Sequence, residues 1–449
     1  MTKGGVQVIE KDIRNHPCCP HGPTILFSRK IEDETRRYFA CSACRDRKQC
    51  NFLLWEDEKS KNKETFWATE NQKFVKGINH RKMFLNLNEI SSQDVSKRSF
   101  CSTCNMFCRD DEKHSTHKVV KGLTDLQLRH PSTILPALDD SKREAQYHFS
   151  ETSVTVIMDI FKELGYRNVI CIGTPRIHEY IQSNCDQMSS ILLDIDKRFH
   201  NFFGPLQFCW YNMFNNHFFF KEAKDVFIDF LQSDGGKDMV IITDPPFGGR
   251  TELISATFKS INNQYQKLNQ TQNTLPMFWI YPYYMEPQIL NSLPDFSMLD
   301  FKVEYDNHQS FQNNSGGRKQ GSPIRIFTNV KPSLIKLPSS DYKHCKICKR
   351  WVAKENKHCA ACNSCTSKNG VTYVHCEECN RCVKPTWKHC KKCGRCAQVQ
   401  HSCAKIEFVK ECFNCKKSGH KKADCPLLTP TQGQKRKKSA EANRKKKKK

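Results

Sequence analysis

Cysteine is the residue that most restricts how this chain can fold, because 26 cysteines occur among its 449 residues and many stand in Cys-x2-Cys pairs. Pairs of this kind form either disulfide frameworks or metal sites. The segment from Met1 to Gly5 has no apolar stretch of the kind found in secretion signals, and histidines are interleaved with the cysteine pairs. The pattern therefore predicts zinc sites in a reducing compartment.

The first predicted zinc site lies near the N-terminus. Two separated pairs of ligands, Cys19 with His21 and Cys41 with Cys50, supply the four nitrogen and sulfur atoms of a closed tetrahedral site. Two further thiols, Cys18 and Cys44, lie beside them, so the choice of ligands stays open at this point.

The second predicted zinc site combines Cys101 and Cys104 with His114 and His117. The loop between the two pairs is shorter than in DNA-reading C2H2 fingers and leaves no room for a base-reading helix. We expect a structural zinc loop that packs against the next domain, with Cys108 as another spare thiol.

A cysteine-rich array begins near residue 344, where the pattern His-Cys-x2-Cys repeats. The residues predicted to bind zinc here are Cys345, Cys348, His358, Cys359, Cys362, Cys365, His375, Cys376, Cys379, Cys382, His389, Cys390, Cys393 and Cys396. Cys403 follows as an extra thiol. Neighbouring pairs can share ions in several ways, so the division of the ligands among the ions is not predicted.

A separate zinc knuckle follows the array: Cys412, Cys415, His420 and Cys425 have the full Cys-x2-Cys-x4-His-x4-Cys spacing. Knuckles of this size expose aromatic and basic side chains to single-stranded nucleic acid. The tail beyond Pro430 is low in complexity and basic, and we expect it to be solvated and to serve as a nuclear or nucleolar address or an RNA anchor.

The net charge of +25 predicts a polyanionic partner, nucleic acid above all. Much of the excess lies in the C-terminal third and ends in the runs 435–438 and 444–449. A membrane surface is the weaker alternative, because neither a basic amphipathic helix, a lipidation motif nor a membrane-spanning apolar run accompanies the charge.

Between about Tyr147 and Val330 the pattern changes to strands that alternate with helices. Strands are predicted at 168–173, 190–194, 208–214, 239–243 and 277–281, with a closing pair at 301–305 and 324–328, and helices at 151–164, 176–184 and 221–231. This alternation predicts an α/β fold: an open, mostly parallel sheet with helices on both faces and a ligand site at the carboxyl ends of its strands.

Two residues fall where that site is expected. Gly173 ends the first strand and permits a close backbone approach, while Asp194 ends the second strand, from which a carboxylate can accept both hydroxyls of a ribose. Asp196 competes with Asp194 for this role. The loop is poor in glycine, which favours a nucleoside over a pyrophosphate-bearing dinucleotide.

The sequence Asp244-Pro245-Pro246-Phe247 follows the fourth strand. Proline interrupts the ladder and has no N–H, so a carboxylate, neighbouring carbonyls and a ring are presented together at the strand end. Such a set suits a flat base with an exocyclic amine, although a strand-terminating turn is the simpler alternative.

The series Gly173, Asp194 and Asp244 to Phe247 resembles S-adenosylmethionine-dependent amino-methyltransferases with an Asp/Asn-Pro-Pro-Tyr/Phe/Trp motif. A GRF-type finger, a C2H2-like loop, this domain, a DHHC-like array and a CCHC knuckle, in that order, resemble the ribosomal RNA N6-adenosine-methyltransferases that carry a zinc knuckle. The resemblance implies a Rossmann-like class I methyltransferase core and a nucleolar enzyme that acts on an adenosine of large-subunit ribosomal RNA, with some cytoplasmic protein. Ribosome-assembly or RNA helicase proteins are expected partners.

The resemblance also implies site residues. Asp244, Pro245, Pro246 and Phe247 form the catalytic set. The cofactor-binding set comprises Tyr147, His148, Phe149, Ser150, Gly173, Arg176, Asp194, Tyr211, Asn212 and Asp244. The first four of these are a candidate cofactor lid, for which ordinary aromatic packing is the alternative, and Tyr211 and Asn212 are candidates to reach the adenine of the cofactor.

The domains are predicted at 1–60 (GRF-type finger), 61–135 (C2H2-like loop and connector), 136–335 (methyltransferase), 336–405 (array), 406–430 (knuckle) and 431–449 (tail). Two other functions share these features: a non-catalytic RNA-binding or ribosome-assembly protein with a methyltransferase-like core, and a DNA adenine methyltransferase.

Overall fold

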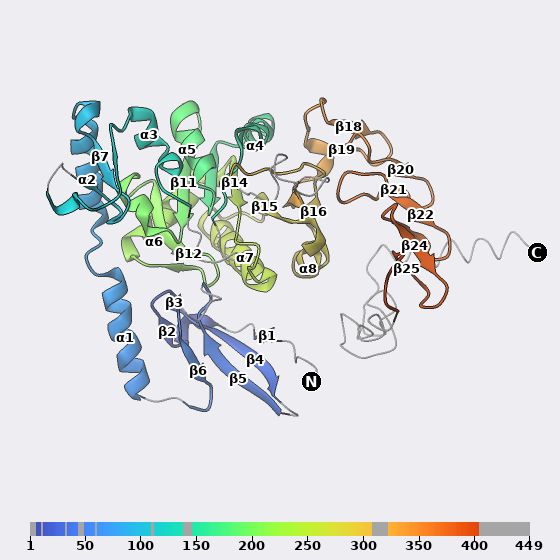
Figure 1. Ribbon diagram of the computed structural model, residues 1–449, viewed down its shortest axis with the longest axis horizontal. Coiled ribbons are helices and arrows are strands. Elements are labelled where there is room, and N and C mark those ends of the chain that lie inside the picture. The colour runs from blue at the N-terminus through green and yellow to red at the C-terminus, as the bar shows by residue number, and fades with distance from the viewer. Residues whose placement is uncertain are drawn as a thin grey trace, which may run out of the picture. The chain divides into compact units, whose positions relative to one another are not determined.

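The computed structural model describes residues 6–9, 12–31, 34–43, 49–58, 61–108, 112–137, 146–307 and 322–403, with the side chains of 61–64 left out. The chain divides into two compact units (Figure 1). The first comprises Met1–Glu355 with Lys368–Gly370, and the second comprises Asn356–Ser367 with the chain from Val371 onward. The zinc knuckle, the basic tail and Cys44 lie outside the described residues.

The first unit is built on an eight-stranded sheet. In spatial order its strands are β13 (His217–Phe218), β12 (Phe208–Asn212), β11 (Ser189–Asp194), β10 (Asn168–Ile172), β14 (Met239–Thr243), β15 (Met277–Pro282), β17 (Ile324–Thr328) and β16 (Ser297–Met298). The five strands from β12 to β15 are parallel, and antiparallel strands complete both edges. The predicted α/β architecture with a mostly parallel sheet is confirmed.

Both faces of this sheet are buried, as the alternation along β10 shows. Val169 and Cys171 pack into one apolar cluster with α4 (Glu151–Glu163) and α5 (Pro175–Asn184). Ile170 and Ile172 pack into the opposite cluster with α6 (Lys221–Leu231), α7 (Thr251–Leu268) and α8 (Glu286–Ser292). Because side chains of a strand alternate between faces, a continuously apolar strand needs helices on both sides.

Short 3-10 helices complete the connections of this domain: η5 (Lys197–Asn201), η6 (Ser233–Gly236) and η7 (Tyr283–Met285). The helices predicted at 151–164, 176–184 and 221–231 correspond to α4, α5 and α6 within one residue at either end. Ser150 caps α4, since its Oγ accepts a hydrogen bond from the N–H of Ser153 at 3.2 Å.

The strand predicted at 301–305 is wrong. β17 pairs antiparallel with β15 on one side and with the short β16 on the other. Residues 301–305 form no ladder with it: their backbone makes an isolated bridge between Tyr305 and Phe149 and one bond to β17, from Val303 N to Ile324 O at 3.2 Å. Phe301, Val303 and Tyr305 alternate with polar residues and are all buried, so they carry the sequence pattern of a strand. They bury their side chains against the core while β16 occupies the edge of β17.

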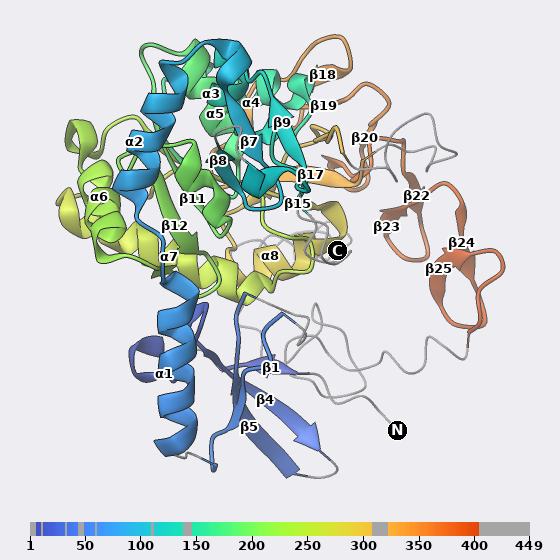
Figure 2. The same ribbon diagram turned by 60° about the vertical axis from the view of Figure 1, so that its left-hand side comes forward.

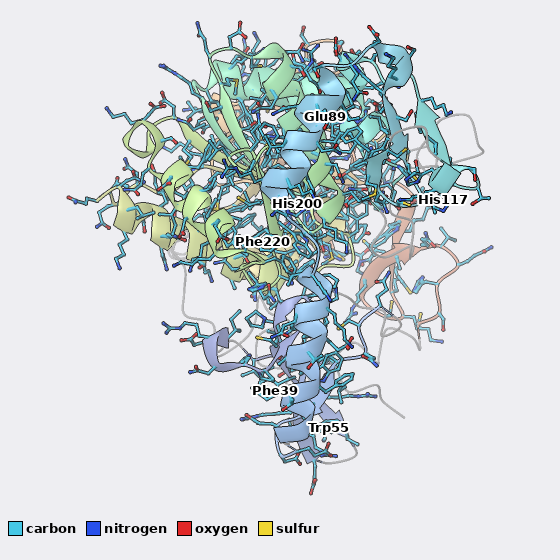
Figure 3. All side chains as sticks on the ribbon, turned by 90° about the vertical axis from the view of Figure 1, so that its left-hand side faces the viewer. Phe39, Trp55, Glu89, His117, His200 and Phe220 are labelled. Atoms are coloured by element: carbon cyan, nitrogen blue, oxygen red, sulfur yellow. The ribbon has the colours of Figure 1, made fainter. Side chains whose placement is uncertain are left out.

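The N-terminal module contains a second, antiparallel sheet. This sheet comprises, in spatial order, β1 (Gln7–Val8), β4 (Ile25–Ile31), β5 (Glu34–Ala40) and β6 (Leu53–Trp55). The module also contains η1 (Ile13–Asn15) and a separate hairpin of β2 (Cys18–Cys19) and β3 (Gly22–Pro23). Figure 3 shows Phe39 and Trp55 in this module and His200 and Phe220 in the central domain.

Two helices follow the N-terminal module: α1 (Lys61–Val75) and α2 (His80–Ser91). Figure 2 shows α1 beside the N-terminal strands and α2 against the central domain. His80 fixes α2 to that domain, because its Nε2–H donates to the carbonyl of Phe203 at 2.8 Å.

The C2H2-like segment forms a small three-stranded sheet of β8 (Met106–Cys108), β7 (Ser99–Cys101) and β9 (Val119–Lys121). The surrounding short helices are η2 (Val95–Lys97), η3 (Glu112–His114), α3 (Asp125–Arg129) and η4 (Pro131–Thr133). The rings of Phe100 and Phe107 both contact Phe202 of the central domain, at centroid distances of 5.2 and 5.1 Å. The segment therefore packs against the next domain, as predicted.

The array is a series of two-stranded hairpins. After η9 (Pro332–Leu334), the first unit includes the hairpin β18 (Tyr342–Cys345) and β19 (Arg350–Ala353). The second unit contains β20 (His358–Cys359) with β21 (Ser364–Cys365), β22 (Val374–Cys376) with β23 (Arg381–Val383), and β24 (Trp387–Cys390) with β25 (Arg395–Gln398). No helix in the described part of the chain is long and apolar enough to cross a membrane.

Candidate active site and metal centres

A cavity of about 490 Å³ opens at the carboxyl ends of β10, β11, β12 and β14. Gly173, Asp194 and Asp244, each of which follows or ends one of these strands, line it together with the remaining residues of the Asp-Pro-Pro-Phe loop. Parallel strands that leave a sheet at the same edge bring their terminal residues together, so residues far apart in sequence meet here.

Asp244 lines the cavity and lies next to the buried side chain of Tyr305. The hydroxyl of Tyr305 donates to Oδ1 of Asp244 at 2.9 Å. Removal from water raises the pKa of Asp244 well above its ordinary range, while the Tyr305 hydrogen bond acts in the opposite direction. Tyr305 was not among the predicted site residues. It lies 61 residues away in the sequence, on a segment that looks like an ordinary strand, so nothing local marks it.

The loop after Asp244 is held by its own backbone and by Tyr281. Pro246 O accepts from the N–H of Gly249 at 2.6 Å, and the Tyr281 hydroxyl donates to Gly249 O at 2.7 Å. Among the described residues, no hydrogen bond to the carbonyl of Pro245 is found. Pro245 follows Asp244 directly and lines the same cavity.

Phe247 presents its ring at the cavity and stacks on Tyr147, with centroids 5.5 Å apart and planes inclined by 21°. This spacing admits no third aromatic ring between the two, because each stacked pair needs roughly 4.5 Å or more between centroids. A base that stacks on this face of Phe247 must therefore displace Tyr147.

Gly173 lies where the loops after β10 and β14 cross. Its φ is +65°, and a Cβ at this position would stand 3.3 Å from the carbonyl oxygen of Asp244. The N–H of Asp244 donates to Ile172 O at 3.3 Å, and the N–H of Gly173 donates to Leu193 O at 2.9 Å. Glycine thus permits the close approach of the two loops that carry the site.

The structure distinguishes the two competing acids. Asp196 is engaged by Arg198, whose Nε and Nη2 donate to Oδ1 and Oδ2 at 2.9 and 2.6 Å. Asp194 lines the cavity and accepts the N–H of Asp196 at 2.8 Å. Burial, and next the charge of Asp196, raise the pKa of Asp194 to about 7. Asp194 is therefore the better candidate for a ligand hydroxyl.

The remaining predicted cofactor residues divide into two groups. Of the candidate lid, only Tyr147 lines the cavity. His148 and Phe149 are buried and Ser150 caps α4. Arg176 lies outside the cavity lining, donates to Phe149 O at 2.7 Å and pairs with Asp306.

Tyr211 and Asn212 line the cavity, but both side chains have partners within the protein. The Tyr211 hydroxyl donates to Oδ1 of Asn216 at 2.7 Å. Nδ2 of Asn212 donates to the carbonyl of His21 at 2.8 Å and to the hydroxyl of Ser42 at 3.1 Å. A direct contact between these two residues and a cofactor stays a prediction.

The N-terminal module forms one wall of the cavity. His21, Ala43 and Gln49 line it, together with Asn105 from the C2H2-like loop. The module is held there by hydrogen bonds to the loop after β12, in which Asn215 also donates to the carbonyl of His21, at 3.1 Å. The sequence gives no indication of this wall, because every contact crosses between modules.

A chain of rings reinforces the same contact. Phe74 at the end of α1 lies against His21 with centroids 5.0 Å apart, and it stacks on Trp210 of β12 at 5.3 Å. Trp210 in turn stacks on Phe219 at 3.9 Å. The predicted metal ligand His21 is thus joined to the central sheet by both hydrogen bonds and apolar packing.

The two N-terminal ligand sets assemble as predicted. Cys19, His21, Cys41 and Cys50 place their ligand atoms within 4.8 Å of one another, and so do Cys101, Cys104, His114 and His117. Cys18 is exposed and Cys108 is buried, and both stand outside these sets. The donor chemistry of both sets is that of structural zinc.

The array reveals how its ligands interleave. One set joins Cys359 and Cys362 to residues of the next hairpin, and the following set repeats this arrangement one hairpin later. The two sets are Cys359, Cys362, His375 and Cys382, and then Cys376, Cys379, His389 and Cys396. Each therefore bridges two consecutive hairpins, which the sequence pattern could not show.

The first hairpins of the array hold four further predicted ligands, and Cys390 and Cys393 lie in the last hairpin. In the first unit, the N–H of Cys348 donates to Sγ of Cys345 at 3.5 Å. In the second unit, His358 and Cys365 are register partners across β20 and β21. The knuckle ligands Cys412, Cys415, His420 and Cys425 lie outside the described residues.

The mostly parallel sheet, the cavity at its carboxyl edge and a family match over residues 140–331 define the class: an α/β methyltransferase. Residues 140–331 match a family described as "Probable N6-adenine methyltransferase", residues 17–59 match "GRF zinc finger" and residues 410–427 match "Zinc knuckle".

The chain is also similar to proteins named rRNA N(6)-adenosine-methyltransferase ZCCHC4. It is 42% identical to the Homo sapiens protein over 92% of this chain and 83% of that protein. It is 45% identical to the Xenopus laevis protein over 95% of this chain and 89% of that protein, and 45% identical to the Mus musculus protein over 92% and 83%. The chain belongs to this family of rRNA N6-adenosine-methyltransferases.

Proposed function

We propose that this protein transfers a methyl group from S-adenosylmethionine to the N6 amine of an adenosine in RNA, most specifically in large-subunit ribosomal RNA. The observation that carries the proposal is the convergence of Asp244, Pro245 and Phe247 on one cavity whose floor also presents Asp194. The names of the related proteins support RNA over DNA and an enzyme over a non-catalytic binding protein.

The cavity fits a nucleoside-bearing methyl donor. Asp194 presents a carboxylate at the end of β11, where it can accept the hydroxyls of a ribose, and Gly173 leaves the neighbouring loop without a side chain. Apolar side chains such as Ile172 and Leu193 line the same space. Bound S-adenosylmethionine supplies an electrophilic methyl group, which the chain's residues have to align with the amine.

The adenine amine is a poor nucleophile, because its lone pair is delocalised into the ring. The residues around Asp244 can make it more reactive. Acceptors at the two N–H groups favour a localised lone pair and stabilise the positive charge that develops during transfer. Asp244 Oδ and the Pro245 carbonyl are the acceptors we assign to this task. No strong general base is needed, because the product ammonium is acidic.

Phe247 supplies the stacking surface for a base that has left its own stack. Because Tyr147 covers one face of Phe247, binding of the base on that face requires Tyr147 to rotate away. Because His21 and Asn105 line the cavity, we assign contacts with the entering RNA to the two zinc-binding modules that carry them. We assign zinc to the four-ligand Cys/His sets, and a nucleolar location to the basic tail.

The proposal is tested by incubating the purified full-length chain with S-adenosylmethionine and an equimolar mixture of RNA and DNA, followed by mass spectrometry of the nucleosides. N6-methyladenosine is expected in the RNA. Asp244→Ala should abolish transfer and spare RNA binding, whereas Asp225→Ala, an exposed carboxylate on α6, serves as the matched control. Transfer retained in Asp244→Ala refutes the role of Asp244, and methylation confined to DNA refutes the substrate.

A further inference from the structure

The loop that follows β12, residues 212–215, joins the cavity to the N-terminal module through the side chains of two asparagines. Asn212 lines the cavity and Asn215 does not, and both are buried. We propose that Asn212 and Asn215 are positioning residues that couple the cofactor site in the cavity to the four-ligand metal set of the N-terminal module. Through them, S-adenosylmethionine and the metal ion each strengthen the binding of the other. This coupling rests on S-adenosylmethionine being the ligand of the cavity, as the proposed function requires.

The module side of the coupling consists of amide donors and oxygen acceptors. Nδ2 of Asn212 donates to the carbonyl of His21 at 2.8 Å and to the hydroxyl of Ser42 at 3.1 Å. Nδ2 of Asn215 donates to the same His21 carbonyl at 3.1 Å and to the carbonyl of Pro23 at 2.8 Å. His21 is itself one of the four ligands, and Ser42 directly follows another. The acceptors therefore keep their positions only while the metal-binding loop keeps its shape.

The cavity side of the coupling starts from the same amide group of Asn212. Its Oδ1 accepts a hydrogen bond from the N–H of Phe214 at 3.0 Å, and Phe214 lines the cavity together with Met213. One planar amide, with its donors toward the metal-binding loop and its acceptor toward the cavity wall, thus connects the two sites. A shift of the His21 carbonyl must move Phe214 or break a buried hydrogen bond.

Apolar packing joins the same wall to the module. Phe214 packs against a cluster formed by Ile25 and Phe27 of β4 and Leu253 of α7. The cavity wall at Phe214 is therefore supported by the N-terminal sheet as well as by the central domain. Docking of the module and the shape of this wall depend on each other.

Coupling of this kind is reciprocal. When the ion leaves the N-terminal set and the loop relaxes, the buried amides of Asn212 and Asn215 lose their acceptors, and the wall loses its fixed geometry. A ligand that contacts this wall then binds more weakly, and by linkage the bound ligand must slow the loss of the ion. The expected change in affinity is about tenfold, which is the contribution of one buried hydrogen bond.

The first test measures binding of S-adenosylmethionine to the full-length, zinc-loaded chain by isothermal titration calorimetry. Asn215→Asp keeps the size of the side chain but places an oxygen where Nδ2 donates to two carbonyls. Because Asn215 does not line the cavity, an affinity about tenfold lower must arise through the module. Asn269→Asp is the matched control, because Asn269 Nδ2 also donates to two carbonyls, those of Leu231 at 2.8 Å and Tyr265 at 3.0 Å, away from the cavity. It should bind the cofactor as the unsubstituted chain does.

A second measurement separates coupling from a general loss of structure. The zinc-loaded chain is exposed to a chelator with and without saturating S-adenosylmethionine, and the retained ions are counted by native mass spectrometry. The cofactor should slow the loss of one ion in the unsubstituted chain and in Asn269→Asp. This protection should be absent from Asn215→Asp and from Cys50→Ala, which lacks a ligand of the N-terminal set. A purely structural defect would lower retention equally with and without the cofactor.

The coupling is overturned if Asn215→Asp binds S-adenosylmethionine as tightly as the unsubstituted chain, or if the cofactor protects an ion equally well in Cys50→Ala. Absence of any S-adenosylmethionine binding by the unsubstituted chain would refute the proposed function and the coupling with it. The two failures are read from different proteins and are therefore distinguishable. Neither readout depends on methyltransferase activity.

Discussion

The hydroxyl of Tyr305 donates a hydrogen bond to Oδ1 of Asp244 at 2.9 Å, across 61 residues of sequence. Tyr305 also stacks on Phe149, with centroids 5.4 Å apart, and this packing holds the hydroxyl in place. The tyrosine thus occupies one lone pair of the carboxylate and leaves the other oxygen for a substrate amine. Burial disfavours the charged form of Asp244, and Tyr305 partly restores it.

Tyr305→Phe should therefore weaken catalysis and shift its pH dependence. Loss of a hydrogen bond to a charged group costs about 1.5–3 kcal/mol, which corresponds to a rate lower by roughly 10- to 100-fold. Because the bond lowers the pKa of Asp244, its removal raises that pKa, and activity should fall at a higher pH as the solution is acidified. The pH profile of kcat/KM measures the shift.

Tyr342→Phe is the control for that experiment. Tyr342 is also a buried tyrosine, and its hydroxyl accepts a hydrogen bond from the N–H of Lys302 at 3.0 Å, away from the cavity. This variant is expected to lose stability without a shift of the acid limb. An unchanged acid limb in Tyr305→Phe would show that the carboxylate of Asp244 does not govern the profile.

Asp194→Asn should stabilise the protein at neutral pH while it weakens binding of S-adenosylmethionine. Burial raises the pKa of Asp194 to about 7, above its ordinary value of 3.8. Between these values the unfolded chain releases the proton and the folded chain keeps it, so the carboxyl group lowers the free energy of unfolding as pH rises from about 4 to about 7.

Asparagine cannot ionise, so Asp194→Asn removes this loss of unfolding free energy, which is on the order of 1–4 kcal/mol at pH 8. The gain in Tm should amount to several degrees at pH 8 and shrink as pH falls toward 4, as measured by calorimetry across pH. Isothermal titration with S-adenosylmethionine should show weaker binding. Equal affinity in the two proteins would remove Asp194 from the proposed ribose site.

Removal of zinc should unfold the metal-bound modules and leave the central sheet intact. The hairpins of the second unit have few apolar residues, so their folding energy is largely the energy of metal binding. Strands such as β10 and β14 are buried on both faces and need no ion. Hydrogen exchange after chelation should lose protection in residues 371–403 and retain it in residues 168–172 and 239–243. Unchanged protection in the hairpins would contradict the zinc assignment.

Much of this site can be predicted from the sequence alone, because a local apolar pattern is enough to locate each parallel strand and the residue that ends it. Asp194 and Asp244 each end a strand whose apolar pattern is unmistakable, and strands of this kind leave the sheet at the same edge. The particular side chains that meet across distant segments are not predicted. Tyr305 reaches Asp244 only because residues 301–305 leave the sheet edge to β16, and the wall at His21 requires two modules to be docked.

The docking of the N-terminal module depends on the absence of a side chain at Gly22. Gly22 has a φ of +95°, and a Cβ there would stand 2.4 Å from Cδ2 of the His217 ring on β13. Gly22→Ala should therefore push the metal-binding loop away from the central domain and loosen the hydrogen bonds from Asn212 and Asn215 to the carbonyl of His21.

Gly77→Ala separates this steric effect from backbone strain. Gly77 also has a positive φ, of +83°, but a Cβ there would meet nothing within 4 Å. Both substitutions force alanine into a left-handed conformation at a cost of about 1 kcal/mol, and only Gly22→Ala adds the clash. We expect Gly22→Ala to keep its zinc and to raise the KM for RNA, with Gly77→Ala close to the unsubstituted enzyme. Equal KM values for the two variants would show that the N-terminal wall of the cavity takes no part in binding RNA.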